Sequence, residues 1–192
     1  MVRIIGLLGN KCSGKDTAGN YLVEKYGYKR YAFADPIKEI ARHLFNLSDV
    51  QLYGNKKEEI DERWNLKPRT IFQRLGTEFG QYTIYNIFPE LKEKFNTRQL
   101  WIYHFNLWVK EEIKKNKNIN IVITDVRFGH EIEEIKKHGG EIIKISNPKL
   151  KKFDKHISEI EIKTLKYDDN ILNNKDLSYL YKQLDIIAQT PF

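Results

Sequence analysis

A glycine-rich stretch near the start of the chain carries the residues with the clearest chemical potential. Its letters GNKCSGK, residues 9–15, have the G-x-x-x-x-G-K spacing of a phosphate-binding loop. Glycines at both ends let such a loop turn its backbone N–H groups inward, and the following helix adds unpaired N–H groups and the positive end of its dipole. The lysine that ends the motif, Lys15, can then reach the β and γ phosphates of a nucleotide. The spacing predicts capture of a polyphosphate.

The neighbours of this lysine offer a choice of metal ligands. The general motif places a Ser or Thr hydroxyl directly after the lysine, where it ligates magnesium. Here that place holds Asp16, and the hydroxyl follows at Thr17. Either Asp16 approaches the metal or the metal depends on other groups, and the sequence leaves both open. The candidate nucleotide-binding residues are Gly9, Lys11, Ser13, Gly14, Lys15, Asp16 and Thr17. The competing interpretation is a glycine-rich turn that binds no nucleotide.

A second chemical group follows the most apolar run of the chain. Residues 119–124, INIVIT, form a β-branched run that is typical of a strand buried on both faces of a parallel sheet, and Asp125 comes next. A carboxylate at the carboxyl tip of a strand, in a chain with a phosphate loop, suits a magnesium site. The alternative makes Asp125 a helix cap and Arg127 a surface charge. The loop upstream favours the catalytic interpretation.

The elements that must position these groups alternate between strand and helix. This order predicts an α/β fold, a five-stranded parallel sheet flanked by helices. Sites in such sheets lie at the carboxyl ends of the strands, so the phosphate loop and Asp125 should meet at one edge. The strand patterns cover residues 4–8, 28–33, 119–124, 141–146 and 168–174.

The length and composition of the chain limit the classes of protein to which it can belong. The 192 residues suit one domain with an inserted lobe, and no apolar run approaches the ~20 residues of a membrane helix. We expect a soluble chain without a signal peptide. The single cysteine, Cys12, cannot form an internal disulfide and suits the reducing cytoplasm. The net charge of +7 comes from lysines interleaved with acidic residues, a pattern more typical of solvated helix faces than of a nucleic-acid site. The five histidines lack zinc-ligand spacing.

Several polar residues on predicted helices are candidates for holding a second anion. Arg69 and Gln73 lie four residues apart on one helix face, where they could hold a phosphate and a base edge. Arg98 and Trp101 lie near the start of an aromatic helix at residues 97–116, for which Thr97 is the predicted N-cap. Each residue also has a plain structural interpretation, as surface charge or core.

Taken together, these blocks resemble the deoxynucleoside monophosphate kinases of large bacteriophages and large DNA viruses, relatives of the nucleoside monophosphate kinase fold. The phosphate loop matches the family's loop, including the aspartate after the lysine. The remaining blocks resemble the family's later segments in the same order. They are FADPIK, PRTIFQRLGTE, RQLW, DVRFGHE and HISE.

The resemblance implies a P-loop kinase fold in a single domain over residues 1–192. It implies a helical acceptor-binding insertion at about 36–116 and a lid-like link at about 147–158, in which lysines stand where such kinases usually have arginines. It implies ATP and Mg²⁺ as cofactors and phosphorylation of a deoxynucleoside monophosphate to the diphosphate. The implied catalytic residues are Lys15, Asp125 and Arg127, and the implied metal ligands are Asp16, Thr17 and Asp125. The implied substrate-binding residues are Arg69, Gln73, Arg98, Trp101, Glu131, His156 and Glu159, of which the last two, with Ser158, belong either to the acceptor side or to lid anchoring. Lys38 is a further candidate for substrate binding, and its interpretation as an ordinary exposed cation is equally good.

Two rival functions stay open at this point. Animal phosphomevalonate kinases resemble the chain around the loop and the segment that ends in DPIK, and a nucleotide-switched binding protein could use the same loop. The aromatic ring of Trp101 and the amide of Gln73 favour an acceptor that carries a base. We expect small-molecule substrates, no stable binding to nucleic acid or membranes, and a cytoplasmic location, which is the host cytoplasm for a viral protein. A homodimer is left open.

Overall fold

The computed structural model describes residues 2–150, 162 and 164–190 of the chain. These residues form two compact units, which are described in turn. The first combines Met1–Ala32 with Leu107–Phe192, and the second is Phe33–Asn106. The long helix α7, Leu100–Lys115, begins in the second unit and ends in the first.

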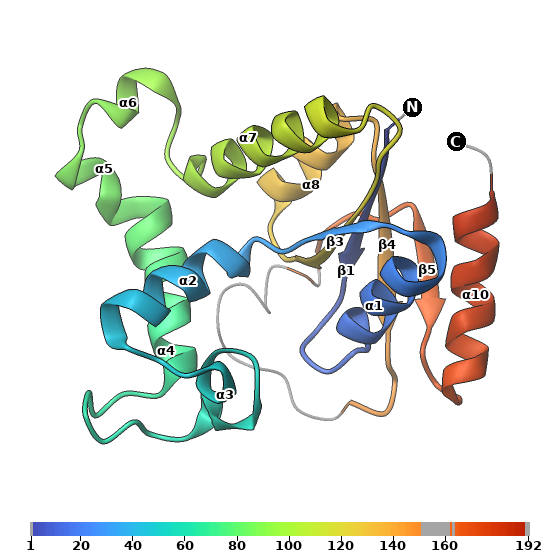
Figure 1. Ribbon diagram of the computed structural model, residues 1–192, viewed down its shortest axis with the longest axis horizontal. Helices are drawn as coiled ribbons and strands as arrows, with labels where there is room; N and C mark the ends of the chain where they lie inside the picture. The colour runs from blue at the N-terminus through green and yellow to red at the C-terminus, as the bar shows by residue number, and fades with distance from the viewer. Residues whose placement is uncertain (1, 151–161, 163, 191–192) are drawn as a thin grey trace. The chain divides into compact units, whose positions relative to one another are not determined.

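The first unit is built on a five-stranded sheet in the order β2-β3-β1-β4-β5, with every neighbouring pair parallel. Figure 1 labels four of these strands, β1, β3, β4 and β5. This confirms the predicted sheet. The register pairs Leu8 with Val126, so the carboxyl ends of β1 and β3 are neighbours. The strands are β1 Arg3–Leu8, β2 Lys29–Tyr31, β3 Asn120–Val126, β4 Glu141–Ser146 and β5 Asp169–Leu172.

The alternation of side chains along β1 assigns each face of the sheet its helices. Ile5 and Leu7 are fully buried in a cluster shared with α1 and α10. Gly6 points the other way, where an added Cβ would lie 2.9 Å from Ile135 of α8. Among the described residues of this unit, the helices besides the end of α7 are α1 Lys15–Tyr26, α8 Gly129–Lys137 and α10 Leu177–Gln189. The sheet is therefore covered on both faces, as a parallel sheet requires.

The second unit is helical. One helical run extends without a break from Pro68 to Ile87, and its middle segment, η2, has π-helical hydrogen bonding. Segments of π-helix are uncommon and are often found at functional sites. The elements of this unit are α2 Ala34–Phe45, α3 Asp49–Leu52, η1 Asn55–Glu58, α4 Pro68–Gln73, η2 Arg74–Thr83, α5 Ile84–Ile87, α6 Leu91–Lys94 and the start of α7.

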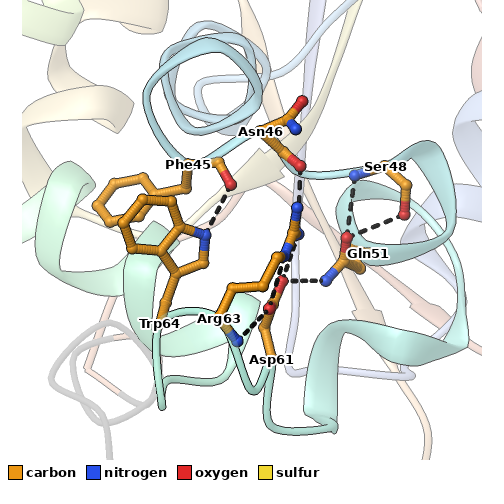
Figure 2. Close-up of polar contacts among 7 residues, drawn as sticks. All are labelled: Phe45, Asn46, Ser48, Gln51, Asp61, Arg63 and Trp64. Carbon is orange, nitrogen blue, oxygen red and sulfur yellow. Dashed lines mark hydrogen bonds and ion pairs between the residues drawn. The ribbon is translucent and has the colours of Figure 1, made fainter.

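A buried carboxylate organises the irregular stretch after α2. Asp61 is 8% exposed and accepts hydrogen bonds from Gln51 and from both the backbone and side chain of Arg63 (Figure 2). The hydrogen bonds of Arg63 are the main cause of the lowered pKa of Asp61. Arg63 also reaches the carbonyl oxygen of Asn46, and the Trp64 indole donates to that of Phe45. These contacts hold a loop whose sequence predicts only short helices.

Two helix starts differ from the predictions made from capping residues. The pair Asp35-Pro36 has the pattern of an N-cap followed by a proline at the first helical position, which predicts that Asp35 caps α2. The helix begins instead at Ala34, because Phe33, buried against Phe105 at 5.5 Å between ring centroids, already has helical dihedral angles. Thr97 was expected to cap the aromatic helix, but it lies in a turn and α7 begins at Leu100. None of the helices in the described part of the chain combines the length and the apolar character that a membrane span requires.

Candidate active site

The phosphate loop has the backbone that its glycines predict. Gly9 and Gly14 have φ values of 155° and 105°, which side-chain-bearing residues rarely adopt. A Cβ at Gly9 would lie 2.5 Å from the carbonyl oxygen of Ile145 and 2.7 Å from Ser13 Oγ. A side chain at position 9 would therefore fill the loop. The loop connects β1 directly to α1, the arrangement that the motif requires.

Lys15 and Ser13 bring polar atoms into this buried loop. Lys15 is only 6% exposed, and its ammonium group donates to the carbonyl oxygen of Asn10 at 2.8 Å. Ser13 is 1% exposed, and its Oγ has no hydrogen-bond partner within the part of the chain that the structure describes. A buried hydroxyl without a partner is costly unless a ligand completes its bonding. Both groups suit a bound anion.

Asn173 supports the loop from the end of β5, a role that the sequence patterns did not reveal. Its Nδ2 donates to the carbonyl oxygen of Ser13 at 2.9 Å, and a Cβ at Gly14 would lie 2.4 Å from the same nitrogen. The one sequence signal is its place directly after a strand, at the edge of the sheet where parallel strands end. An asparagine there is too common to identify without the structure.

Asp125 lies near the end of β3, beside the strand that leads into the phosphate loop. It is half-buried, and the pairing of Leu8 with Val126 sets both strand ends at one edge of the sheet. The alternative role of helix cap belongs instead to Glu131, whose Oε2 accepts from the backbone N–H groups of Arg127 at 2.7 Å and Phe128 at 3.0 Å.

Glu131 therefore helps to hold the backbone that follows β3 at this edge of the sheet. Burial raises the pKa of Glu131 to about 8, and the nearby charge of Asp125 acts in the same direction, while the N–H group of Arg127 opposes it. A neutral carboxyl group can still accept both hydrogen bonds through its carbonyl oxygen. Its predicted contact with substrate stays a prediction.

The oxygen donors at this edge suit magnesium held mainly by phosphate. No cluster of three or more His, Cys, Asp or Glu side chains that could hold a metal occurs among residues 2–150, 162 and 164–190. Mg²⁺ often uses one or two protein carboxylates and takes its other ligands from substrate phosphates and water. Asp125 fits that requirement. Asp16 is exposed and Thr17 half-buried at the start of α1, so both stay candidates.

The candidate acceptor residues belong to the second unit, apart from Glu131 and the two residues near the predicted lid. Lys38 lies 3.6 Å from Asp35 and 4.4 Å from the centroid of the Tyr53 ring. Arg69 forms an ion pair with Glu58. Gln73 is half-buried at the end of α4.

Arg98 lies just before α7, and Trp101 is in the first turn of that helix. Trp101 is 7% exposed and its indole N–H donates to the carbonyl oxygen of Gly76 at 2.8 Å, so the structure gives it a packing role. Arg98 has a φ of 68°, and its Nε donates to Gln81 Oε1 at 3.0 Å. Contact of either residue with a substrate stays a prediction.

The remaining predicted residues, His156, Ser158 and Glu159, lie outside the described residues, as does most of the predicted lid at 147–158. Only residues 147–150 of that link are described, following the end of β4.

Comparison with known proteins extends these observations. The model of the family "Deoxynucleotide monophosphate kinase" matches residues 3–65 and 50–184. A protein of Acanthamoeba polyphaga mimivirus named "Putative deoxynucleotide monophosphate kinase" is 40% identical over 185 residues, which are 94% of this chain and 93% of the relative. A "Dephospho-CoA kinase" of Fusobacterium nucleatum is 30% identical over 98% of both chains.

Solved structures support the fold alone. The crystal structure of shikimate kinase from Aquifex aeolicus has a TM-score of 0.50 to this chain at 15% identity, and the match covers 96% of this chain and 95% of that one. The predicted P-loop kinase fold is thus confirmed. With its phosphate loop, its parallel sheet and a family match over most of its length, the chain belongs to the deoxynucleotide monophosphate kinase family.

Proposed function

We propose that this protein transfers the γ-phosphoryl group of ATP to the phosphate of a deoxynucleoside monophosphate, which yields ADP and the deoxynucleoside diphosphate. The observation that carries the proposal is the phosphate loop, in which buried Ser13 lies between two glycines of unusual backbone conformation and buried Lys15 follows the second of them. Membership of the family and the name of the mimivirus relative support the choice of acceptor.

The chemistry needs little from the protein beyond binding and charge. The attacking atom is an oxygen of the acceptor phosphate, which is already ionised at neutral pH, so no general base is required. Backbone N–H groups of the loop and the Lys15 ammonium hold the β and γ phosphates of the donor, and Arg127 adds a cation for the transferred group. Rates then depend on alignment and on exclusion of water.

A magnesium ion would be held by Asp125 together with Asp16 or Thr17, and when bound it neutralises charge on the phosphate oxygens. The half-buried carboxylate of Asp125 supports this assignment, since a hard cation prefers oxygen ligands.

On the acceptor side, we infer that the helical unit Phe33–Asn106 supplies the residues that bind the monophosphate. Arg69 and Arg98 offer guanidinium groups that can pair with phosphate oxygens through two hydrogen bonds, and Lys38 adds a point charge. The amide of Gln73 can recognise a base edge. We place the reaction in the cytoplasm with small molecules as the only substrates.

A panel of acceptors tests the proposal directly. ADP release is measured with ATP and Mg²⁺ and, one at a time, each deoxynucleoside monophosphate, its ribonucleotide counterpart, phosphomevalonate and dephospho-CoA. The last is included because a relative of that name is 30% identical to this chain. We expect turnover that depends on a deoxynucleotide and on Mg²⁺. Turnover only with dephospho-CoA or phosphomevalonate, or ATP binding with no acceptor used, would exclude the proposed reaction.

A further inference from the structure

A non-glycine residue in a strained backbone conformation lies just before helix α7. Arg98 has a φ of 68°, in the left-handed region that favours glycine. An arginine persists there only when its surroundings impose the conformation, and such residues cluster at functional sites. Arg98 is also one of the proposed acceptor contacts, so the cause of its conformation bears on function.

Gln81, in the π-helical segment η2, accepts hydrogen bonds from both the backbone and the side chain of Arg98. The backbone N–H of Arg98 donates to the carbonyl oxygen of Gln81 at 3.1 Å, and the Arg98 Nε donates to Gln81 Oε1 at 3.0 Å. Gln81 itself is 2% exposed, so its side chain has little freedom to move. One residue thus holds both the main chain and the guanidinium plane of Arg98.

The residues that follow Arg98 are held by the same helical run. The Tyr85 hydroxyl, 1% exposed as a residue, accepts from the backbone N–H groups of Gln99 at 3.2 Å and Leu100 at 3.1 Å. These N–H groups precede or open α7 and would otherwise lack partners within the helix. Tyr85 therefore takes the capping role that a side chain at Thr97 would have served.

Trp101 completes the anchoring. Its ring occupies the space beside Gly80, where an added Cβ would lie 2.5 Å from the indole. The indole N–H of Trp101 donates a hydrogen bond to the carbonyl oxygen of Gly76. Consecutive residues from Arg98 to Trp101 are in this way attached to positions 76, 81 and 85. The backbone of the segment cannot relax without breaking several of these contacts.

The chemistry of Gln81 suits the orientation of a cation that must keep its charge. A carboxylate at this place would pair with the guanidinium and neutralise it, whereas an amide oxygen accepts the hydrogen bond and leaves the positive charge. Because the guanidinium group is planar and its N–H donors have fixed directions, a bond to Nε sets the plane of the whole fork. A phosphate that pairs with these N–H groups would therefore bind a guanidinium group that is already oriented.

We propose that Gln81 is a positioning residue for acceptor binding: it holds Arg98 in the left-handed conformation and presents its guanidinium to the acceptor phosphate. The inference rests on the proposed function, in which Arg98 contacts the acceptor. It adds a residue, Gln81, that lies outside the sequence blocks used to identify the site.

The experiment compares Gln81→Glu, Arg98→Ala and Arg98→Gly with the unmodified chain. Each is assayed for KM of the deoxynucleotide, KM of ATP, kcat and thermal unfolding. For Gln81→Glu we expect the acceptor KM to rise about tenfold, with unchanged KM for ATP and no loss of thermal stability, because the new carboxylate holds Arg98 but cancels its charge. A merely structural glutamine would show lowered stability with both KM values unaffected.

The two Arg98 variants test whether the positive φ at position 98 is strained. Both should weaken acceptor use alike, and Arg98→Gly should unfold at a higher temperature than Arg98→Ala, because glycine adopts a positive φ without steric cost. Equal unfolding temperatures would overturn the claim that the conformation is imposed on the arginine.

Gln99→Glu is the matched control, since it adds the same charge one residue away from Arg98. We expect its acceptor KM to stay within about twofold of the unmodified value. An equal rise in Gln99→Glu and Gln81→Glu would replace the positioning role with a general charge effect. An unchanged acceptor KM in Gln81→Glu, with a raised one in Arg98→Ala, would overturn the role of Gln81 and leave the proposed function intact. Absence of deoxynucleotide turnover by the unmodified chain would overturn both, and it is seen before any variant is made.

Discussion

The side-chain amide of Asn173 donates a hydrogen bond to the backbone carbonyl oxygen of Ser13 at 2.9 Å, across 160 positions of the chain. The bond joins the end of β5 to the middle of the phosphate loop. It matters because phosphate-binding loops hold their ligands through backbone N–H groups, whose directions depend on how the main chain is supported.

Replacement of Asn173 by alanine should therefore weaken nucleotide binding more than it weakens the fold. We expect KM for ATP to rise by roughly three- to tenfold and the free energy of unfolding to fall by about 1 kcal/mol, the usual worth of one hydrogen bond. Steady-state kinetics and urea unfolding measure the two effects. Asn170→Ala is the matched control, because Asn170 lies on the same strand and accepts from Ser146 at 2.6 Å without reaching the loop. Equal KM values for the two variants would contradict the role of Asn173.

Lys15→Ala should abolish transfer while the fold is retained. The ammonium group lies 2.8 Å from the carbonyl oxygen of Asn10, inside the loop, where it would meet the β and γ phosphates. Loss of this cation should lower kcat by at least about 100-fold, the scale seen when one group that stabilises transition-state charge is removed. A coupled ADP assay measures kcat, and circular dichroism reports the fold. Lys182→Ala, on an exposed position of α10, should behave as the unmodified protein. Normal turnover by Lys15→Ala would count against the site.

The stabilities of two Glu131 variants should show whether this residue acts as a helix cap or as a charged ligand group. Glu131→Gln keeps an oxygen that can accept from Arg127 and Phe128, so the free energy of unfolding should change little. Glu131→Ala removes the acceptor and should cost about 1–2 kcal/mol, as for other lost helix caps. Urea unfolding of the two variants at neutral pH makes the comparison. A large loss of stability in the glutamine variant would show that the group is needed as a carboxylate.

Gly80 should tolerate no side chain, because the Trp101 ring occupies the space that a Cβ would need. We expect Gly80→Ala to lower the free energy of unfolding by about 1–3 kcal/mol, the usual cost of overpacking, despite the better helix propensity of alanine. Gly76→Ala is the matched variant in the same helical segment. Its Cβ would meet only the flexible end of the Ile37 side chain, at 2.8 Å, so its loss should be smaller. The reverse order in urea unfolding would contradict the packing of Trp101.

Asp185 should make the stability of the fold depend on pH in the acidic range. It accepts from Lys25 at 2.8 Å and from the hydroxyls of Tyr21 and Tyr26 at 2.7 Å, and these bonds, that of Lys25 first, lower the pKa of Asp185 to about 2. A lowered folded-state pKa contributes stability above the unfolded value of about 3.9, and that stability is lost as the pH falls toward 2. We expect the unmodified protein to unfold at a higher temperature than Asp185→Asn at pH 7, with the difference shrinking below about pH 4. A constant difference from pH 7 to pH 2.5 would rule this linkage out.

Local patterns in the chain were enough for the order of strands and helices, the phosphate loop and the placement of Asp125. Each depends on a short stretch, since a β-branched run makes a buried strand, two glycines and a lysine make the loop, and parallel strands end at a common edge. The predicted sheet was correct for this reason. Helix starts were less reliable, because the capping residues expected at Asp35 and Thr97 were overridden by the packing of Phe33 and by the Tyr85 hydroxyl.

The contacts that hold the site in shape could not be read from any stretch of the chain. Asn173 meets Ser13, and Gln81 meets Arg98, only because packing brings distant segments together, and neither pair leaves a periodic signal. Trp101 has the spacing of either a core residue or a base contact, and its burial and bonded indole N–H show that it packs, while its contact with a base stays a prediction. Residue types and spacing express short-range steric and hydrogen-bond preferences, whereas partners far apart in the chain are selected by the free energy of the whole packed fold.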